Sequence, residues 1–119
     1  VEAAAQRAMA RGIVVVTHEA DSQLNTHADL EPFDHAAFGA ALNERLAACM
    51  GGQGQWTTFV GTRGSRTHRR WIDAAHANAQ RHSGLRLIEP LNESNDDAEQ
   101  AYRIARALLQ RHPELRGFQ

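Results

Sequence analysis

Short apolar runs alternate with helix-length amphipathic segments from residue 34 to residue 119, and this alternation limits the possible folds more than any other feature. The apolar runs lie at 56–61, 85–89 and 115–118. Strands that alternate with helices form a parallel sheet, because each helix returns the chain to the starting edge of the sheet. The sequence therefore predicts an α/β fold, a three-layer arrangement in which a parallel sheet has helices on both faces.

Three helices are predicted around these runs, at 35–50, 66–82 and 96–111. Asp34 is the predicted N-cap of the first helix and Asn95 that of the third, because short polar side chains accept hydrogen bonds from free N–H groups at helix starts. Gly51-Gly52, Ser83-Gly84 and His112-Pro113 end the three helices. Helical spacing predicts three buried stripes: Phe38, Leu42, Leu46 and Cys49; Trp71, Ile72, Ala75 and Ala79; and Ala98, Ala101, Tyr102, Ala105, Leu108 and Leu109.

The first third of the chain has a different pattern. Residues 2–11 are rich in alanine and predict a helix that Gly12 ends. Ile13–Val16 is continuously apolar, which is typical of a strand buried on both faces of a parallel sheet. Residues 17–34 are polar and irregular, and we interpret them as a linker between two lobes.

Composition excludes several classes of protein. The net charge of −1 does not favour a nucleic-acid partner, and the single cysteine, Cys49, excludes a disulfide framework. The seven histidines lack metal-site spacings, and no phosphate-binding glycine loop or nucleophile elbow is present. We therefore expect no metal, no cofactor and no catalytic residues. No apolar run approaches the length of a membrane span.

Three polar loops follow predicted strands, at 17–21, 62–70 and 92–97. Ligands of open α/β sheets bind at the carboxyl ends of the strands, so we expect these loops to converge on one edge. Their carboxylate, amide and guanidinium groups are suited to binding sugar hydroxyls. Two alternatives stay open, since Asn beside a helix start is more often a cap than a ligand contact, and an arginine cluster such as that at 63–70 is usually a solvated face.

Four segments resemble the type I periplasmic sugar-binding proteins, in the branch that contains rhamnose-binding and autoinducer-2-binding proteins. They are AMARGIVVVTHEAD at 8–21, EPFDHAAFGAAL at 31–42, MGGQGQWTTFVGTRGSRTHRRWIDAA at 50–75 and NESNDDAEQAYRIARALLQRHPELRGFQ at 92–119. The resemblance implies an incomplete binding protein of two lobes. Residues 1–22 would end the first lobe, 23–33 would form a hinge, and 34–119 would be the first half of the second lobe.

The resemblance also implies a ligand site. Its residues would be Glu19 after the first strand, the helix start with Thr67, His68 and Arg69, and Asn95 in the third loop. The autoinducer-2 binders have Asp-Gln in place of Thr67-His68, so the rhamnose-type members are the better match.

These observations favour a sugar-binding protein of an ABC import system over an enzyme. The expected partners are a sugar or sugar-like ligand and a membrane permease, the expected location is periplasmic or extracytoplasmic, and open sheet edges would favour a homodimer. Two alternatives are the effector domain of a sugar-responsive transcription repressor and a small flavodoxin-like enzyme. The upstream gene region would distinguish them, since only the repressor requires a preceding helix-turn-helix.

Overall fold

A computed structural model describes residues 1–20 and 22–119 of the chain; Asp21, in the first predicted polar loop, lies outside the described residues. The chain forms two compact units, Val1–Asp34 and His35–Gln119, and each is described by itself. The predicted division into a lobe end, a hinge and a half-lobe stays a prediction.

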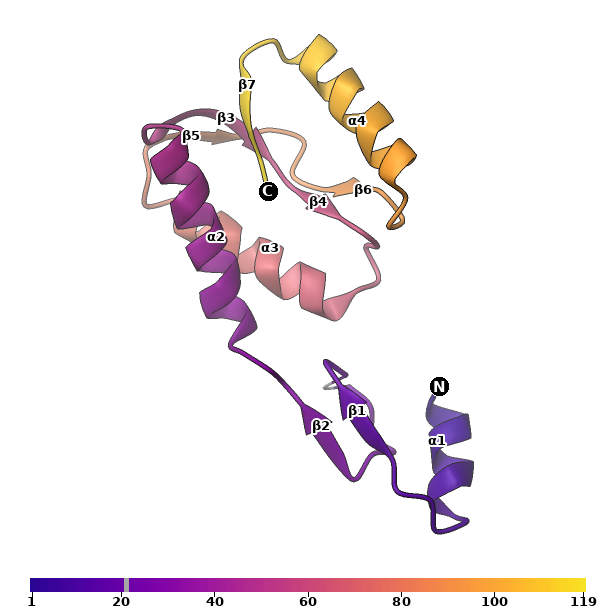
Figure 1. Cartoon of the computed structure of the whole chain (residues 1–119). Helices are drawn as coiled ribbons and strands as arrows, with labels where there is room; N and C mark the ends of the chain where they lie inside the picture. The colour runs from indigo at the N-terminus through magenta and orange to yellow at the C-terminus, as the bar shows by residue number, and fades with distance from the viewer. Residues whose placement is uncertain (21) are drawn as a thin grey trace. The chain divides into compact units, whose positions relative to one another are not determined.

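Strands and helices alternate in the second unit, and all of its strand pairs are parallel (Figure 1). This arrangement confirms the predicted α/β fold with a parallel sheet. Figure 1 shows α4 on the opposite side of β3 and β7 from α2 and α3, so helices cover both faces. The elements are α2 (His35–Cys49), β3 (Gln53–Thr57), β4 (Phe59–Val60), α3 (Arg66–Ala79), β5 (Gly84–Leu87), β6 (Asn92–Glu93), α4 (Ala98–Arg111) and β7 (Leu115–Phe118).

Two short sheets, ordered β5-β3-β7 and β4-β6, continue one another. The Ile88 N–H donates to the Trp56 carbonyl at 2.9 Å, and pairing resumes where the Asn92 N–H donates to the Thr58 carbonyl at 3.0 Å. Residues 89–91 leave the ladder between these two points. The strand expected at 85–89 is therefore β5, which ends at Leu87, and a second strand, β6, lies in the segment expected to be a loop, with a three-residue bulge between the two.

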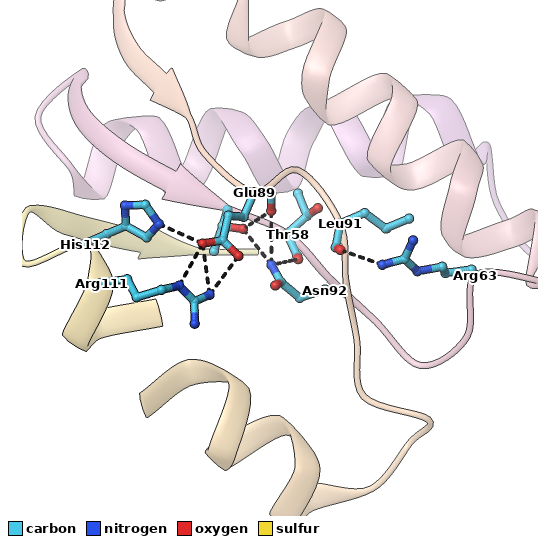
Figure 2. Close-up of polar contacts among 8 residues, drawn as sticks. Thr58, Arg63, Glu89, Leu91, Asn92, Arg111 and His112 are labelled. Atoms are coloured by element: carbon cyan, nitrogen blue, oxygen red, sulfur yellow. Dashed lines mark hydrogen bonds and ion pairs between the residues drawn. The ribbon is translucent and has the colours of Figure 1, made fainter. Parts of the chain in front are cut away.

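Buried side chains hold this bulge in place. The Thr57 hydroxyl donates to the Glu89 carbonyl at 2.6 Å, and the Thr58 hydroxyl donates to the Pro90 carbonyl. The Asn92 amide nitrogen lies 2.8 Å from Thr57 Oγ1. It also lies 3.0 Å from the Thr58 carbonyl and 3.1 Å from the Glu89 carbonyl, two residues labelled beside it in Figure 2. Because buried carbonyls need donors, these side chains replace the ladder bonds that the bulge interrupts.

The buried face of α2 differs from the predicted stripe. Phe38, Leu42 and Cys49 are exposed, and Leu46 alone packs against the core. The buried positions recur every four residues, at His35, Gly39, Asn43 and Ala47. The reason is the close approach of α3: a Cβ on Gly39 would lie 2.2 Å from the Trp71 carbonyl oxygen. Large apolar side chains therefore lie beside the helix contact and not within it.

The apolar core lies between the sheet and the pair α2 and α3. Met50, Trp56 and Ala75 form its buried centre, and Leu46, Ala79, Leu85 and Leu87 pack around them. Ile72 is buried, as predicted, whereas Trp71 is half-buried. Because β4 and β6 pair in parallel, as do β3 and β7, and the Phe59 N–H donates to the Gln119 carbonyl at 2.6 Å, the ends of β4, β6 and β7 lie at one edge of the unit.

Two details of α4 also correct the sequence prediction. Asp97, not Asn95, is the N-cap: its Oδ1 accepts from the Gln100 N–H at 2.6 Å. Asn95 has a φ of +53° and lies in the preceding turn. Leu108 is fully buried, but Tyr102 and Leu109 are exposed. No helix among the described residues is long and apolar enough to cross a membrane.

The unit Val1–Asp34 contains α1 (Glu2–Met9), β1 (Val16–His18) and β2 (Ala28–Leu30), and its two strands are parallel. The strand predicted at Ile13–Val16 therefore begins later, and the expected irregular linker contains a strand. Local β propensity is not enough to place a strand, because its ladder requires a partner, and here the partner is β2. Ile13 and Val14 are 54% and 71% exposed, contrary to the predicted burial.

Candidate ligand-binding site

Two of the predicted polar loops meet at the carboxyl edge of the sheet. The Arg63 N–H donates to Glu93 Oε1 at 2.7 Å. The Arg63 guanidinium donates to the Leu91 carbonyl at 3.3 Å, as Figure 2 shows. An ion pair of 3.5 Å also joins the Arg63 Nε to the Glu93 carboxylate. The loops that follow β4 and β6 are therefore held together, as expected for adjacent parallel strands, and Arg63 is engaged in this contact.

A pocket of about 250 Å³ opens at this edge, between the strand ends and α3. Its walls are mostly apolar, with a small number of polar groups, which is typical of small-molecule sites. The lining residues are Phe59, Val60, Gly61, His68, Trp71, Ile72, Ser94 and Gln119.

His68 is the predicted site residue that lines this pocket. It lies in the first turn of α3, where the Ser65 hydroxyl caps the helix by accepting from the His68 N–H at 3.2 Å. Its ring centroid is 5.2 Å from that of Trp71. Its Nδ1 atom is buried and has no hydrogen-bond partner among the described residues. An unpaired buried nitrogen costs free energy, so a ligand hydroxyl in the pocket would be a favourable partner for it.

Trp71 packs against two residues of α2 and also contributes to the pocket wall. Its Nε1–H donates to His35 Nδ1 at 2.9 Å, and Phe38 packs against it edge-on at 5.1 Å between ring centroids. The sequence predicted Trp71 as a core residue at helical spacing. The structure gives it packing contacts on α2 together with a position in the pocket.

Ser94 lies in the predicted polar loop 92–97 but was not singled out as a contact, and Gln119 was not predicted. The Ser94 hydroxyl donates to the Val60 carbonyl at 3.2 Å, which leaves its lone pairs available. The Gln119 Oε1 accepts from Asn43 at 3.2 Å, and its Nε2 donates to the Gly39 carbonyl at 3.4 Å. Both residues directly follow a strand, β6 or β7, so the carboxyl-edge rule could have found them.

Within the unit His35–Gln119, the other predicted site residues, Thr67, Arg69 and Asn95, do not line this pocket. Thr67 is half-buried and Arg69 is exposed, both in the first turn of α3. Asn95 is exposed, and its amide nitrogen lies 3.5 Å from Gln100 Oε1. Glu19 belongs to the unit Val1–Asp34, where it is half-buried, has a φ of +53° and donates its N–H to the Leu30 carbonyl at 3.1 Å. The carboxylate of Asp96, the residue after Asn95, lies against the pocket residue Gly61: a Cβ on Gly61 would be 1.9 Å from Asp96 Oδ1.

A cluster of ionisable side chains lies at the surface of the bulge, and its residues do not line the pocket. The Glu89 carboxylate accepts from His112 Nε2 at 2.7 Å and from the Arg111 guanidinium at 2.9 Å (Figure 2). These hydrogen bonds, from His112 first and Arg111 second, lower the pKa of Glu89 below its ordinary value. Because both partners come from the end of α4, the cluster ties the bulge to that helix.

A larger hollow of about 710 Å³ lies at the opposite edge, near the amino ends of β3, β5 and β7, and includes Arg86 and Arg116. We place the candidate site at the smaller pocket because ligands of α/β sheets bind at the carboxyl ends of strands. No group of three or more potential metal-ligating side chains occurs in the described part of the chain.

The whole chain, residues 1–119, matches the periplasmic binding protein domain family. The chain belongs to this family. Among curated proteins, no match to the chain was found.

Solved structures with the same fold include several solute-binding proteins of ABC transporters. One from Burkholderia graminis, in complex with D-arabinose, is 23% identical with a TM-score of 0.87, and the alignment covers 99% of this chain and 40% of that one. One from Clostridium phytofermentas with bound L-rhamnose is 20% identical with a TM-score of 0.82, covering 98% and 37%. A glucose-galactose binding protein from Geobacillus stearothermophilus is 20% identical with a TM-score of 0.80, covering 94% and 40%.

The chain thus spans about two-fifths of the length of these structures. At such identities the likeness shows the fold: this periplasmic binding protein domain shares a type I lobe architecture with proteins that bind sugars.

Proposed function

We propose that this periplasmic binding protein domain belongs to a solute-binding protein that captures a sugar or sugar-like molecule outside the cytoplasm and delivers it to an ABC permease. The observation that carries the proposal is the pocket at the carboxyl edge, where the aromatic rings of Phe59 and Trp71 accompany His68 Nδ1, a buried atom that no described residue hydrogen-bonds. A sugar has apolar C–H faces that pack on aromatic rings and hydroxyls that satisfy polar atoms.

A deoxy sugar of the rhamnose type is the proposed ligand class. Among the described residues, the lining of the pocket contains no arginine or carboxylate, because the nearby Arg63 is paired with Glu93 and does not line it. A methyl group in place of a hydroxyl would be favourable against Phe59 and Ile72. The Thr67-His68 pair, which resembles the rhamnose-type members, and the L-rhamnose in one structural neighbour support the same choice.

Glu19, Thr67, Arg69 and Asn95 remain predicted contacts alongside His68. Thr67 and Arg69 lie one residue on either side of His68 in the first turn of α3, and Asn95 follows the pocket residue Ser94, so all three are sequence neighbours of pocket residues. In a two-lobe protein the ligand would stabilise the closed form by binding it more tightly than the open one.

Titration of the ¹⁵N-labelled chain with L-rhamnose and D-arabinose, followed by NMR, tests this function. We expect the backbone amides of Gly61, His68, Ser94 and Gln119 to shift, with L-rhamnose binding more tightly. The dissociation constant should be no lower than about millimolar, some 4 kcal/mol, since hydrogen bonds to the sugar largely replace those to water in an open pocket.

The matched variants are His68→Ala, which should abolish or weaken the shifts, and Arg86→Ala, which alters the opposite edge and should leave them unchanged. Shifts confined to the Arg86 edge, or none with either sugar, would contradict the proposal.

A further inference from the structure

A continuous line of hydrogen-bonded side chains crosses the contact between α2 and α3 and ends at the candidate pocket. It begins at the surface with His82 and Glu44, passes through Asn78 and Asn43, and reaches Gln119. Asn43 is fully buried and Asn78 is 7% exposed. We call these five residues the amide relay.

The bonds of the relay are all of ordinary length. His82 Nε2 lies 2.8 Å from Glu44 Oε2, and the Asn78 amide nitrogen donates to the same oxygen at 3.1 Å. The Asn78 amide nitrogen also donates to Asn43 Oδ1 at 3.2 Å. The Asn43 amide nitrogen in turn donates to Gln119 Oε1 at 3.2 Å.

The donor and acceptor roles along the relay follow from the negative charge of the Glu44 carboxylate at its surface end. An ionised carboxylate only accepts, so Asn78 must turn its nitrogen toward Glu44 and also supply the N–H to Asn43. Asn43 then accepts with its oxygen, and its nitrogen faces Gln119. Gln119 must therefore accept with Oε1 and direct Nε2 to the Gly39 carbonyl.

This order determines what Gln119 offers a ligand. Its Nε2 carries two hydrogens, one of which is engaged by Gly39, so one N–H remains in a residue that lines the pocket. Hydrogen bonds from Asn78 first, and from His82 second, lower the pKa of Glu44, which favours the ionised form that the relay requires.

We propose that Asn43 is a positioning residue, and that the Glu44 carboxylate orients the Gln119 amide through the relay so that it donates a hydrogen bond to an acceptor on the ligand. This inference rests on the proposed function for the identity of the ligand, but the relay itself is defined by contacts within the free chain. Glu44 and His82 lie in a separate groove on the outer face of α2 and α3, so a group outside the pocket controls a group inside it.

The test uses the intact 119-residue chain and the side-chain amide resonance of Gln119. Glu44→Gln removes the charge at a side chain that is 57% exposed, so folding should be retained. We expect the Gln119 resonance to move in Glu44→Gln and in Asn43→Leu. It should stay in place in Glu99→Gln, which removes a carboxylate from the exposed first turn of α4. An unmoved Gln119 resonance in Glu44→Gln would overturn the relay.

Titration with L-rhamnose provides the second readout. Loss of one oriented hydrogen bond should weaken binding about 2- to 12-fold in Glu44→Gln and in Gln119→Ala, and Glu99→Gln should bind like the parent. Unchanged affinity in Glu44→Gln would overturn the positioning role. If the parent chain binds no sugar, the proposed function fails, but the Gln119 resonance still decides whether the relay exists.

Discussion

Replacing Asn92 by aspartate should destabilise the unit His35–Gln119 at neutral pH, by an amount that follows from the atoms around its amide nitrogen. That nitrogen faces three oxygens within 3.1 Å: Thr57 Oγ1 and the carbonyls of Thr58 and Glu89. The Thr57 hydroxyl already donates to the Glu89 carbonyl, so it has no proton left for a new carboxylate. The substituted group would face acceptors alone, and a buried charge without a partner costs about 3–5 kcal/mol.

The destabilisation should depend on pH in a defined direction. Burial among acceptors raises the pKa of the substituted carboxyl in the folded state above its unfolded value of about 3.9. The neutral acid has one O–H to donate, so the variant should approach the stability of the parent at low pH. Its relative stability should then be lost as the pH rises through the folded-state pKa.

Urea unfolding followed by tryptophan fluorescence measures this effect, since both tryptophans, Trp56 and Trp71, lie in this unit. The measured quantity is the difference in unfolding free energy between variant and parent at acidic and at neutral pH, so that the carboxylates common to both proteins cancel. Asn92→Ala is the control, because it loses the donors without adding a titrating group and its difference should not vary with pH. Parent-like stability of Asn92→Asp at neutral pH would refute the role assigned to this amide.

Two further perturbations test the packing. Gly39→Ala should lower the free energy of urea unfolding by about 1–3 kcal/mol, because the new Cβ would lie 2.2 Å from the Trp71 carbonyl oxygen, and this outweighs a gain of about 1 kcal/mol in helix propensity. The control is Gly64→Ala, whose Cβ would have a single neighbour at 3.6 Å and which should leave the stability unchanged; equal effects of the two substitutions would count against the close helix contact. Exposed apolar residues of the unit Val1–Asp34, among them Val14 and Val16, should make the chain associate. Light scattering should show a dimer or larger species, and Val14→Asp should lower the fraction of chain in that species. A monomeric parent chain would contradict this expectation.

Sequence patterns predicted the helices well because their signals are local. Glycines end α2, and their φ angles of +68° and +74° are those that glycine adopts readily. Asn95 was predicted as a cap because the segment Asn95-Asp96-Asp97 offers three capping residues in a row, and only the backbone conformation selects Asp97. The predicted buried face of α2 was wrong, because hydrophobic periodicity identifies apolar residues, whereas a close helix contact requires small ones such as Gly39 and Ala47.

The candidate site was predicted in outline by a rule of topology. The loops after β4 and β6 do meet, and His68 lies in the pocket. Phe59 escaped prediction because the face that a strand residue presents is known only when the register is known, whereas Gln119 follows β7 and the carboxyl-edge rule could have found it. The bulge also could not be predicted, since it depends on Thr57 and Asn92, which contact each other across 35 positions of sequence.

The buried amides between α2 and α3 also restrict how this unit can deform. Apolar helices slide past one another at low cost, but a shift of α2 by one turn, about 5.4 Å, would break the Asn43–Asn78 bond and leave both amides unsatisfied. The same shift would also replace Gly39 at the helix contact by a residue four positions away, His35 or Asn43, whose side chain would clash with the Trp71 backbone. Shear between these helices is therefore unfavourable, and any hinge motion would carry the two as one rigid block.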